Sequence, residues 1–135
     1  MPKAILCTID FSQPSRQVVR WAVALACELH AHLTLLYTYR LVHVKGEEAL
    51  QLKKKMEDEA LRNFGSLEKE MLKDTGISYD FKTEVGFIAD RVEDHVKKNP
   101  IDFLVINKNT SQESREAIDE LVEHTQIPLI IVPAS

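Results

Sequence analysis

Short apolar runs alternate with stretches of helical period along the whole chain, and this alternation most constrains the fold. The first run, residues 4–9, is nearly continuous and apolar, as expected for a central strand that is covered on both faces. Further runs of strand length span residues 33–39, 79–85, 103–106 and 127–132. The run at 79–85 alternates polar and apolar residues, which predicts a strand with one exposed flank or at the edge of a sheet.

Amphipathic segments separate these runs and carry their own start and stop signals. Ser12 is a good N-cap for the first helix. Thr75-Gly76 ends a long helix that begins near Glu48, and Asn99-Pro100 ends the next one, because proline cannot continue a helix. Strands and helices that alternate in this way imply a parallel sheet with helices on both faces. We therefore expect one domain over residues 1–135, with a three-layer α/β/α fold around a five-stranded parallel sheet.

The single tryptophan and the two cysteines are assigned to the interior. Trp21 flanks the apolar stripe of the first helix, so we expect it to pack rather than to bind a ligand. Cys7 and Cys27 lie in apolar surroundings without metal-ligand spacing, which predicts two reduced core residues in a cytoplasmic protein. The histidines are scattered, and none stands near a cysteine or aspartate at ligand spacing. No metal site is expected.

The charge balance argues against several classes of partner. With a formal net charge of −4 at pH 7, the chain has no general affinity for nucleic acid or anionic lipid. Basic residues cluster at 53–55, but acidic residues follow at once, which is typical of a solvated helix face. No run approaches the roughly 18 apolar residues that a membrane span needs. The amino terminus enters a strand directly, so we expect no cleavable signal peptide.

Ligands of parallel α/β sheets bind at the carboxyl ends of the strands, where the strand order reverses. In this chain that rule points to Asp10-Phe11-Ser12 and to residues 107–111. The second of these turns contains no glycine, since the glycines stand at 46, 65, 76 and 86. Backbone amides approach a phosphate most closely where no side chain intervenes, so this turn is a poor pyrophosphate cradle. No Walker-type loop, GxGxxG, GxSxG or HExxH motif is present, and no catalytic residue is assigned.

Polar residues at these turns are the candidates for holding a nucleotide or an anion: Asp10, Asn107, Lys108, Thr110 and Ser111. Most of them have an alternative role. Asp10 could face the crevice or accept backbone N–H bonds within its own turn. Lys108 could contact an anion or simply be solvated. Thr110 and Ser111 could cap the following helix, where Thr110-x-x-Glu113 forms a capping box.

Several segments together resemble the universal stress protein family. KAILCTIDFSQPS is similar to its first strand and the D-x-S turn that follows, and HLTLLYTY is similar to its second strand. EVGFIA resembles the third strand with its V-x-G-x-x-A turn, residues 101–106 resemble the fourth strand, and IPLIIVP resembles the closing strand. The resemblance covers essentially the whole chain in the right element order. It implies an adenine nucleotide alpha hydrolase-like sheet of order 3-2-1-4-5 that dimerises, frequently through the fifth strand.

The nucleotide-binding branch of that family carries G-x-x-G and then G-[S/T] after the fourth strand. This sequence has residues 107–110 in place of the first part and residues 117–120 in place of the second. The adenine-side aspartate of the family carries over as Asp10. The resemblance therefore implies a stress-response role, while the same comparison argues against ATP as a cofactor.

The leading interpretation is a cytoplasmic, non-enzymatic stress-response or regulatory protein that acts as a homodimer, with an unidentified protein partner also possible. Its dimer edge is the fifth strand, which would otherwise expose unpaired backbone and apolar side chains. The apolar residues of that edge are Leu129, Ile130, Ile131 and Val132. The alternative is an ATP- or AMP-binding signalling domain with a divergent phosphate loop, or a weak nucleotide hydrolase.

Overall fold

The computed structural model describes residues 3–108 and 112–133, in which parallel strands alternate with helices. The strands are β1 (Ala4–Ile9), β2 (His32–Tyr39), β3 (Ser78–Val85), β4 (Phe103–Lys108) and β5 (Leu129–Pro133). The helices are α1 (Gln13–Leu29), α2 (Gly46–Leu67), α3 (Ile88–Lys98) and α4 (Gln112–His124). A π-helical turn, η1 (Glu68–Leu72), continues α2. The long helix expected to end at Thr75-Gly76 is therefore present in two consecutive pieces.

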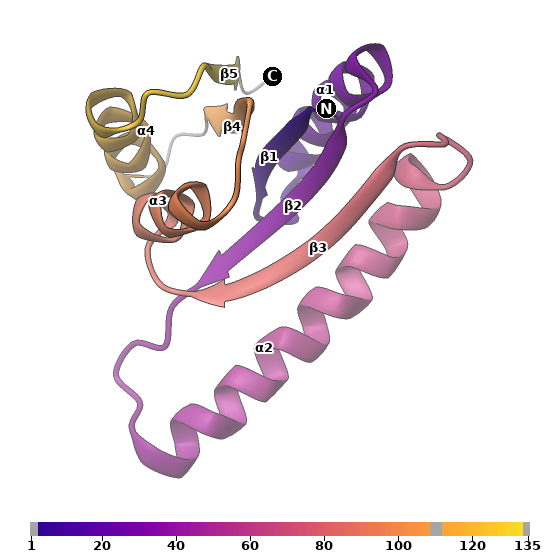
Figure 1. The fold of residues 1–135 in the computed structure, drawn as a ribbon. Helices are drawn as coiled ribbons and strands as arrows, with labels where there is room; N and C mark the ends of the chain where they lie inside the picture. Colours follow the sequence, from indigo (N-terminus) through magenta and orange to yellow (C-terminus); the bar gives the residue numbers. More distant parts are fainter. Residues whose placement is uncertain (1–2, 109–111, 134–135) are drawn as a thin grey trace.

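The strands form one sheet in the order β3-β2-β1-β4-β5, and every neighbouring pair in it is parallel (Figure 1). This confirms the expected fold class and strand order. Strand β3 lies at one edge of the described sheet, as its alternating sequence predicted, and β5 lies at the other. The strand order reverses between β1 and β4, so their carboxyl ends open the crevice in which such sheets bind ligands.

Each face of the sheet is closed by its own apolar core. On one face, Val18 and Val19 of α1 pack with Leu67 and Leu72 of α2 and η1 against the inward side chains of the strands. On the other face, helices α3 and α4 pack against a second set of apolar side chains from the strands. That second core consists of Leu6, Leu36, Ala89, Val92, Leu104, Ile106, Ala117 and Leu121. Strand β1 supplies Leu6 to one core and Ile5 and Cys7 to the other, as its unbroken apolar sequence requires.

The chain turns between elements at positions whose backbone is left-handed. Phe11 has φ 64° in the turn after β1, and its ring packs on Tyr37 with centroids 5.1 Å apart. Gly76 and Gly86, with φ of 76° and 139°, lead into β3 and out of it. Such φ values are open to glycine and strained for most other residues. Ser12 caps α1, because its side chain accepts a hydrogen bond from the Ser15 N–H.

Two residues assigned to the interior lie on the surface instead. Trp21 is 60% exposed on α1, and Cys27 is exposed near the end of the same helix, whereas Cys7 is fully buried. A helix turns by about 100° per residue, so Cys27 points away from the sheet that its neighbour Ala26 contacts. Both thiols are free. Among the described residues, no helix is apolar over enough of its length to cross a membrane.

Candidate functional site

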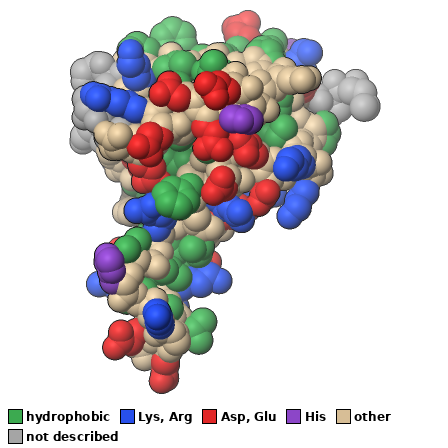
Figure 2. All heavy atoms as spheres, turned by 90° about the vertical axis from the view of Figure 1, so that its left-hand side faces the viewer, with side chains coloured by type: hydrophobic (Ala, Val, Ile, Leu, Met, Phe, Trp, Pro, Cys, Tyr) green, Lys and Arg blue, Asp and Glu red, His purple; other side chains and the backbone are tan. Residues whose placement is uncertain are grey.

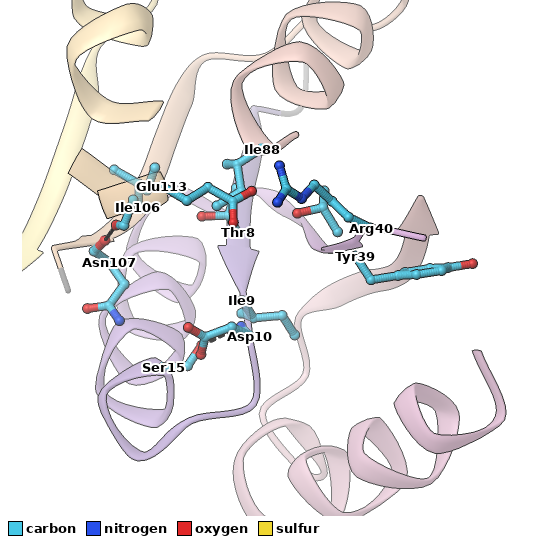
Figure 3. Close-up of a pocket in the computed structure, with 12 residues that line it drawn as sticks. Thr8, Ile9, Asp10, Ser15, Tyr39, Arg40, Ile88, Ile106, Asn107 and Glu113 are labelled. Carbon is cyan, nitrogen blue, oxygen red and sulfur yellow. Dashed lines mark hydrogen bonds between the residues drawn. The ribbon is translucent and has the colours of Figure 1, made fainter. Parts of the chain in front are cut away.

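The crevice lies at the carboxyl ends of β1, β2 and β4, as the strand order requires, and has a volume of about 220 Å³ (Figure 3). Strands β1, β2 and β4, helix α4 and the starts of α1 and α3 supply its walls. Its lining residues are Thr8, Ile9, Asp10, Ser15, Thr38, Tyr39, Arg40, Ile88, Ile106, Asn107, Glu113 and Ser114. Two of the five sequence-predicted residues, Asp10 and Asn107, are therefore brought together here.

Asp10 is held by the turn that starts α1. Its Oδ1 accepts hydrogen bonds from the Ser12 N–H at 2.9 Å and the Ser12 hydroxyl at 2.5 Å. The Asp10 N–H in turn donates to Ser15 Oγ at 3.1 Å. This is the turn-forming role that the sequence left open, and it coexists with a position on the crevice wall. The structure therefore places Asp10 in both roles.

Asn107 is the most unusual polar residue of the crevice. It is 6% exposed, and neither its Nδ2 nor its Oδ1 has a hydrogen-bond partner among the described residues. Its backbone carbonyl accepts from the Ser114 hydroxyl at 3.3 Å, which ties the end of β4 to α4. A buried carboxamide normally satisfies both its donor and its acceptor. Asn107 thus offers one donor group and one acceptor to whatever enters the crevice.

The charged side chains that line the crevice have a net negative charge, which disfavours the binding of phosphate. Asp10 and Glu113 are acidic and Arg40 is basic, so the described lining carries one more negative than positive charge. In Figure 3 the Glu113 carboxylate and the Arg40 guanidinium extend into the same end of the pocket. The Arg40 guanidinium also lies 4.4 Å from the centre of the Phe87 ring, a cation–π contact at the rim. The positive charge of Arg40 is therefore already stabilised in part by the Phe87 ring.

The remaining predicted residues fall elsewhere. Lys108 is exposed and is absent from the described crevice lining. Thr110 and Ser111, with the capping box that includes Thr110, lie outside the described residues. Arg40 and Glu113 were not among the sequence-predicted residues. Arg40 could have been found, because it follows β2 and the carboxyl ends of parallel strands meet at one edge.

A second hollow of about 400 Å³ lies between α2, β3 and α3. Its basic lining residues are Lys53, Lys82, Arg91 and Lys98, and acidic Glu57, Glu84 and Asp94 lie among them. His95, which is 6% exposed, lies in the same wall. Burial, assisted by Lys82, holds the pKa of His95 below its usual value, so the imidazole is neutral at pH 7.

One group of described residues has ligand atoms that could reach a common metal ion. Glu93 on α3 and Glu120 and His124 on α4 bring these atoms within 4.8 Å of one another. Acidic side chains gather on the face of the molecule that Figure 2 shows. Glu120 and His124 are exposed, where water competes for both the ion and the ligands. The arrangement is not assigned as a metal centre.

The four apolar residues of the expected dimer edge have different surroundings. Val132 is 3% exposed, and Leu129 and Ile130 pack against the two cores of the same chain. Ile131 is 40% exposed. An interface along β5 would therefore use the strand backbone and Ile131, because the other three side chains already stabilise the monomer.

Comparisons with known proteins agree with the fold. The model of the universal stress protein family matches residues 1–133. The structure of the universal stress protein UspA from Lactobacillus plantarum superposes with a TM-score of 0.82 at 18% identity, over 96% of this chain and 97% of that one. A universal stress protein family member from Burkholderia pseudomallei gives 0.78 at 21% identity, over 98% and 96%. No curated protein matches the sequence.

A third solved structure carries a ligand. It is a universal stress protein family protein from Arabidopsis thaliana with AMP bound, and it gives a TM-score of 0.70 at 14% identity, over 99% of this chain and 93% of that one. At this level of identity the likeness shows the fold alone.

Proposed function

Because this chain belongs to the universal stress protein family, we propose that it is a regulatory stress-response protein whose crevice performs no catalysis and binds no Mg-ATP. It acts in the cytoplasm as a homodimer. The observation that carries the proposal on catalysis and Mg-ATP is the charge of the crevice, because its described lining holds two acidic residues, Asp10 and Glu113, and one basic residue, Arg40. A triphosphate brings several negative charges, and like charges in a confined site repel strongly.

The size and backbone of the crevice support the same conclusion. Its volume of about 220 Å³ is below the roughly 300–1,000 Å³ of most ligand pockets. No glycine stands in the sequence between β4 and α4, so a phosphate would meet side chains rather than bare backbone amides. Glu113 lies in the first turn of α4, where its carboxylate already interacts with the positive end of the helix dipole that would otherwise attract an anion.

The nucleotide proposal is tested by melting the purified chain with and without ligand. We expect millimolar Mg-ATP to leave the melting temperature unchanged, because a ligand that does not bind the folded state cannot stabilise it. Protein denatured directly after purification should also release no material that absorbs near 260 nm. A reproducible rise in melting temperature with Mg-ATP would overturn the proposal.

A second candidate function is favoured by Asn107. Its carboxamide, which has no hydrogen-bond partner within residues 3–108 and 112–133, presents a donor and an acceptor, and the carboxamide of asparagine can pair with the edge of adenine. The universal stress protein family protein from Arabidopsis thaliana has been solved with AMP bound. The crevice could therefore sense AMP or a smaller adenine compound instead of ATP. A melting shift with AMP or adenosine, but none with Mg-ATP, would select this second function.

The proposal of a homodimer rests on the edge of the sheet that β5 forms. Strand β5 pairs with β4 on one side and has no described strand on the other. Unpaired edge backbone beside an apolar residue is a template for strand addition by a second copy. Ile131, 40% exposed, is the side chain that such an interface would bury.

Replacing Ile131 by aspartate is expected to convert the dimer into a monomer, because the charge would be buried without a partner. Light scattering at micromolar concentration measures the mass, and circular dichroism checks that the fold persists. Leu61→Asp is the matched control, since Leu61 is 60% exposed on α2 and should leave the dimer intact. A wild-type chain that scatters as a monomer would reject the interface.

A further inference from the structure

Three polar residues at the amino-terminal ends of β2 and β3 form a continuous hydrogen-bonded row, at the opposite end of the sheet from the crevice. Ser78 Oγ lies 2.6 Å from His32 Nδ1, and His32 Nε2 lies 2.8 Å from Asp80 Oδ1. A serine, a histidine and an aspartate linked in this order are the parts of an activated nucleophile. None of the three was singled out from the sequence, because His32 is more than 40 positions away from both Ser78 and Asp80.

The register of the sheet produces this row. His32 pairs with Ser78 and Thr34 pairs with Asp80 across the parallel strands. Ser78 and Asp80 are two residues apart in a strand, so their side chains point to the same face and reach His32 from both sides. The Thr34 hydroxyl donates a second hydrogen bond to Asp80 Oδ1 at 2.7 Å. The aspartate is thus fixed from β2 by two separate donors.

The protonation states follow from these contacts. Partial burial raises the pKa of the Asp80 carboxyl, but the hydrogen bonds from Thr34 and His32 outweigh it and hold this pKa below its usual value. Asp80 is therefore ionised at pH 7 and accepts a hydrogen bond from the His32 tautomer that carries its proton on Nε2. That tautomer leaves the lone pair on Nδ1, which faces the Ser78 hydroxyl. His32 can accordingly act as the general base for Ser78.

We propose that Ser78 is an activated nucleophile and a covalent modification site, which accepts an acyl group from a small activated ester or thioester. Ser78 Oγ forms a bond to the acyl carbon, and the bond from that carbon to the leaving alkoxide or thiolate breaks. The hydroxyl proton passes to His32 Nδ1 and from there to the leaving group. The products are one acyl-serine and one free alcohol or thiol, so atoms and electrons balance.

The surroundings give a donor access to this serine. Ser78 is exposed, and the side chains of His32 and Asp80 are 40% and 39% exposed. Ser78 and His32 also border a hollow of about 660 Å³. Its other lining residues are Ala26, Cys27, His30, Ala31, Thr75, Gly76 and Ile77. Small and apolar groups dominate this wall, which suits a short acyl chain better than a charged one.

The experiment treats the full chain with a fluorophosphonate probe and, separately, with p-nitrophenyl acetate. Peptide mass spectrometry then locates the label. A Cys27→Ser background removes the exposed thiol of the same hollow as a competing nucleophile. We expect one label per chain, on Ser78. Ser78→Ala should abolish it, and His32→Gln should slow it about 100-fold. Ser66→Ala, at an exposed serine of α2, is the matched control and should label at the wild-type rate.

Asp80 is a positioning residue and needs a readout of its own. Among the described residues, the ionisable side chains that contact His32 or line the same hollow are Asp80, Cys27 and His30, while Lys82 acts on Asp80. In Asp80→Asn the imidazole of His32 loses the carboxylate that orients it and balances the charge it gains, so the labelling rate of Ser78 should fall, and Asp80→Glu should restore part of it. A purely structural role would lower the labelling rate equally in Asp80→Asn and in Asp80→Glu. Label spread over several residues, or an unchanged rate in His32→Gln, would overturn the proposal.

Discussion

Replacing Leu35 by alanine is expected to lower the free energy of unfolding by about 3 to 5 kcal/mol. Leu35 is fully buried in β2, a strand paired on both sides, and it packs in the core beneath α1 and α2. The alanine loses the transfer energy of the removed methyl groups and leaves a cavity, because the paired strands on each side resist collapse. A domain of this size has a total stability of about 5 to 15 kcal/mol, so this variant is close to the limit of folding.

Urea denaturation followed by circular dichroism measures this change. Leu61→Ala is the matched control, because it removes the same atoms from a residue that is 60% exposed on α2. Its effect should stay within about 0.5 kcal/mol. Equal losses at the two positions would contradict the assignment of Leu35 to a tightly packed core.

The second large effect is a stabilisation. Replacing Asn107 by leucine should raise the free energy of unfolding by about 1 to 3 kcal/mol, because it removes a buried donor and acceptor that have no partner in the part of the chain that the structure describes. The side chain is 6% exposed and similar in size to leucine, and the backbone bond from Ser114 is retained. A gain in stability at this position would show that the wild-type chain keeps the carboxamide at a cost, as expected of a residue that contacts a ligand.

The matched control is the asparagine at the end of α3. Asn99 Nδ2 donates to the His95 carbonyl at 3.1 Å, so Asn99→Leu should lower the stability by about 1 kcal/mol. Both variants are compared with the wild type in the same urea titration. If Asn107→Leu destabilises the chain, its carboxamide is satisfied in solution and no longer points to a ligand.

Most of the fold could be predicted from local sequence. The unbroken apolar run of β1 requires cover on both faces, and the alternating run of β3 requires an exposed side, and the structure shows both. The interior was predicted less well. Trp21 and Cys27 lie beside the apolar stripe of α1 but are exposed, because the width of the stripe depends on how much sheet lies beneath the helix.

The candidate site was predicted only where it follows a strand end. Asp10 follows β1 directly, and Asn107 lies near the carboxyl end of β4. The rule that ligands bind at the carboxyl ends of parallel strands therefore located both residues. Glu113 reaches the same crevice from a helix, and no strand-end rule points to it. The charge balance that disfavours a triphosphate depends on Arg40 and Glu113, and it therefore became visible only in three dimensions.

The sequence by itself determined the class of fold, the order of the elements and the absence of glycine after β4, because hydrophobic period and backbone freedom are local properties of a chain. The tertiary structure decided which distant side chains meet. It left the side chain of Asn107 without a hydrogen-bond partner among the described residues, and it aligned Ser78, His32 and Asp80 across two strands. Such contacts depend on strand register, which is set by the packing of both cores at once and has no signature in any single segment.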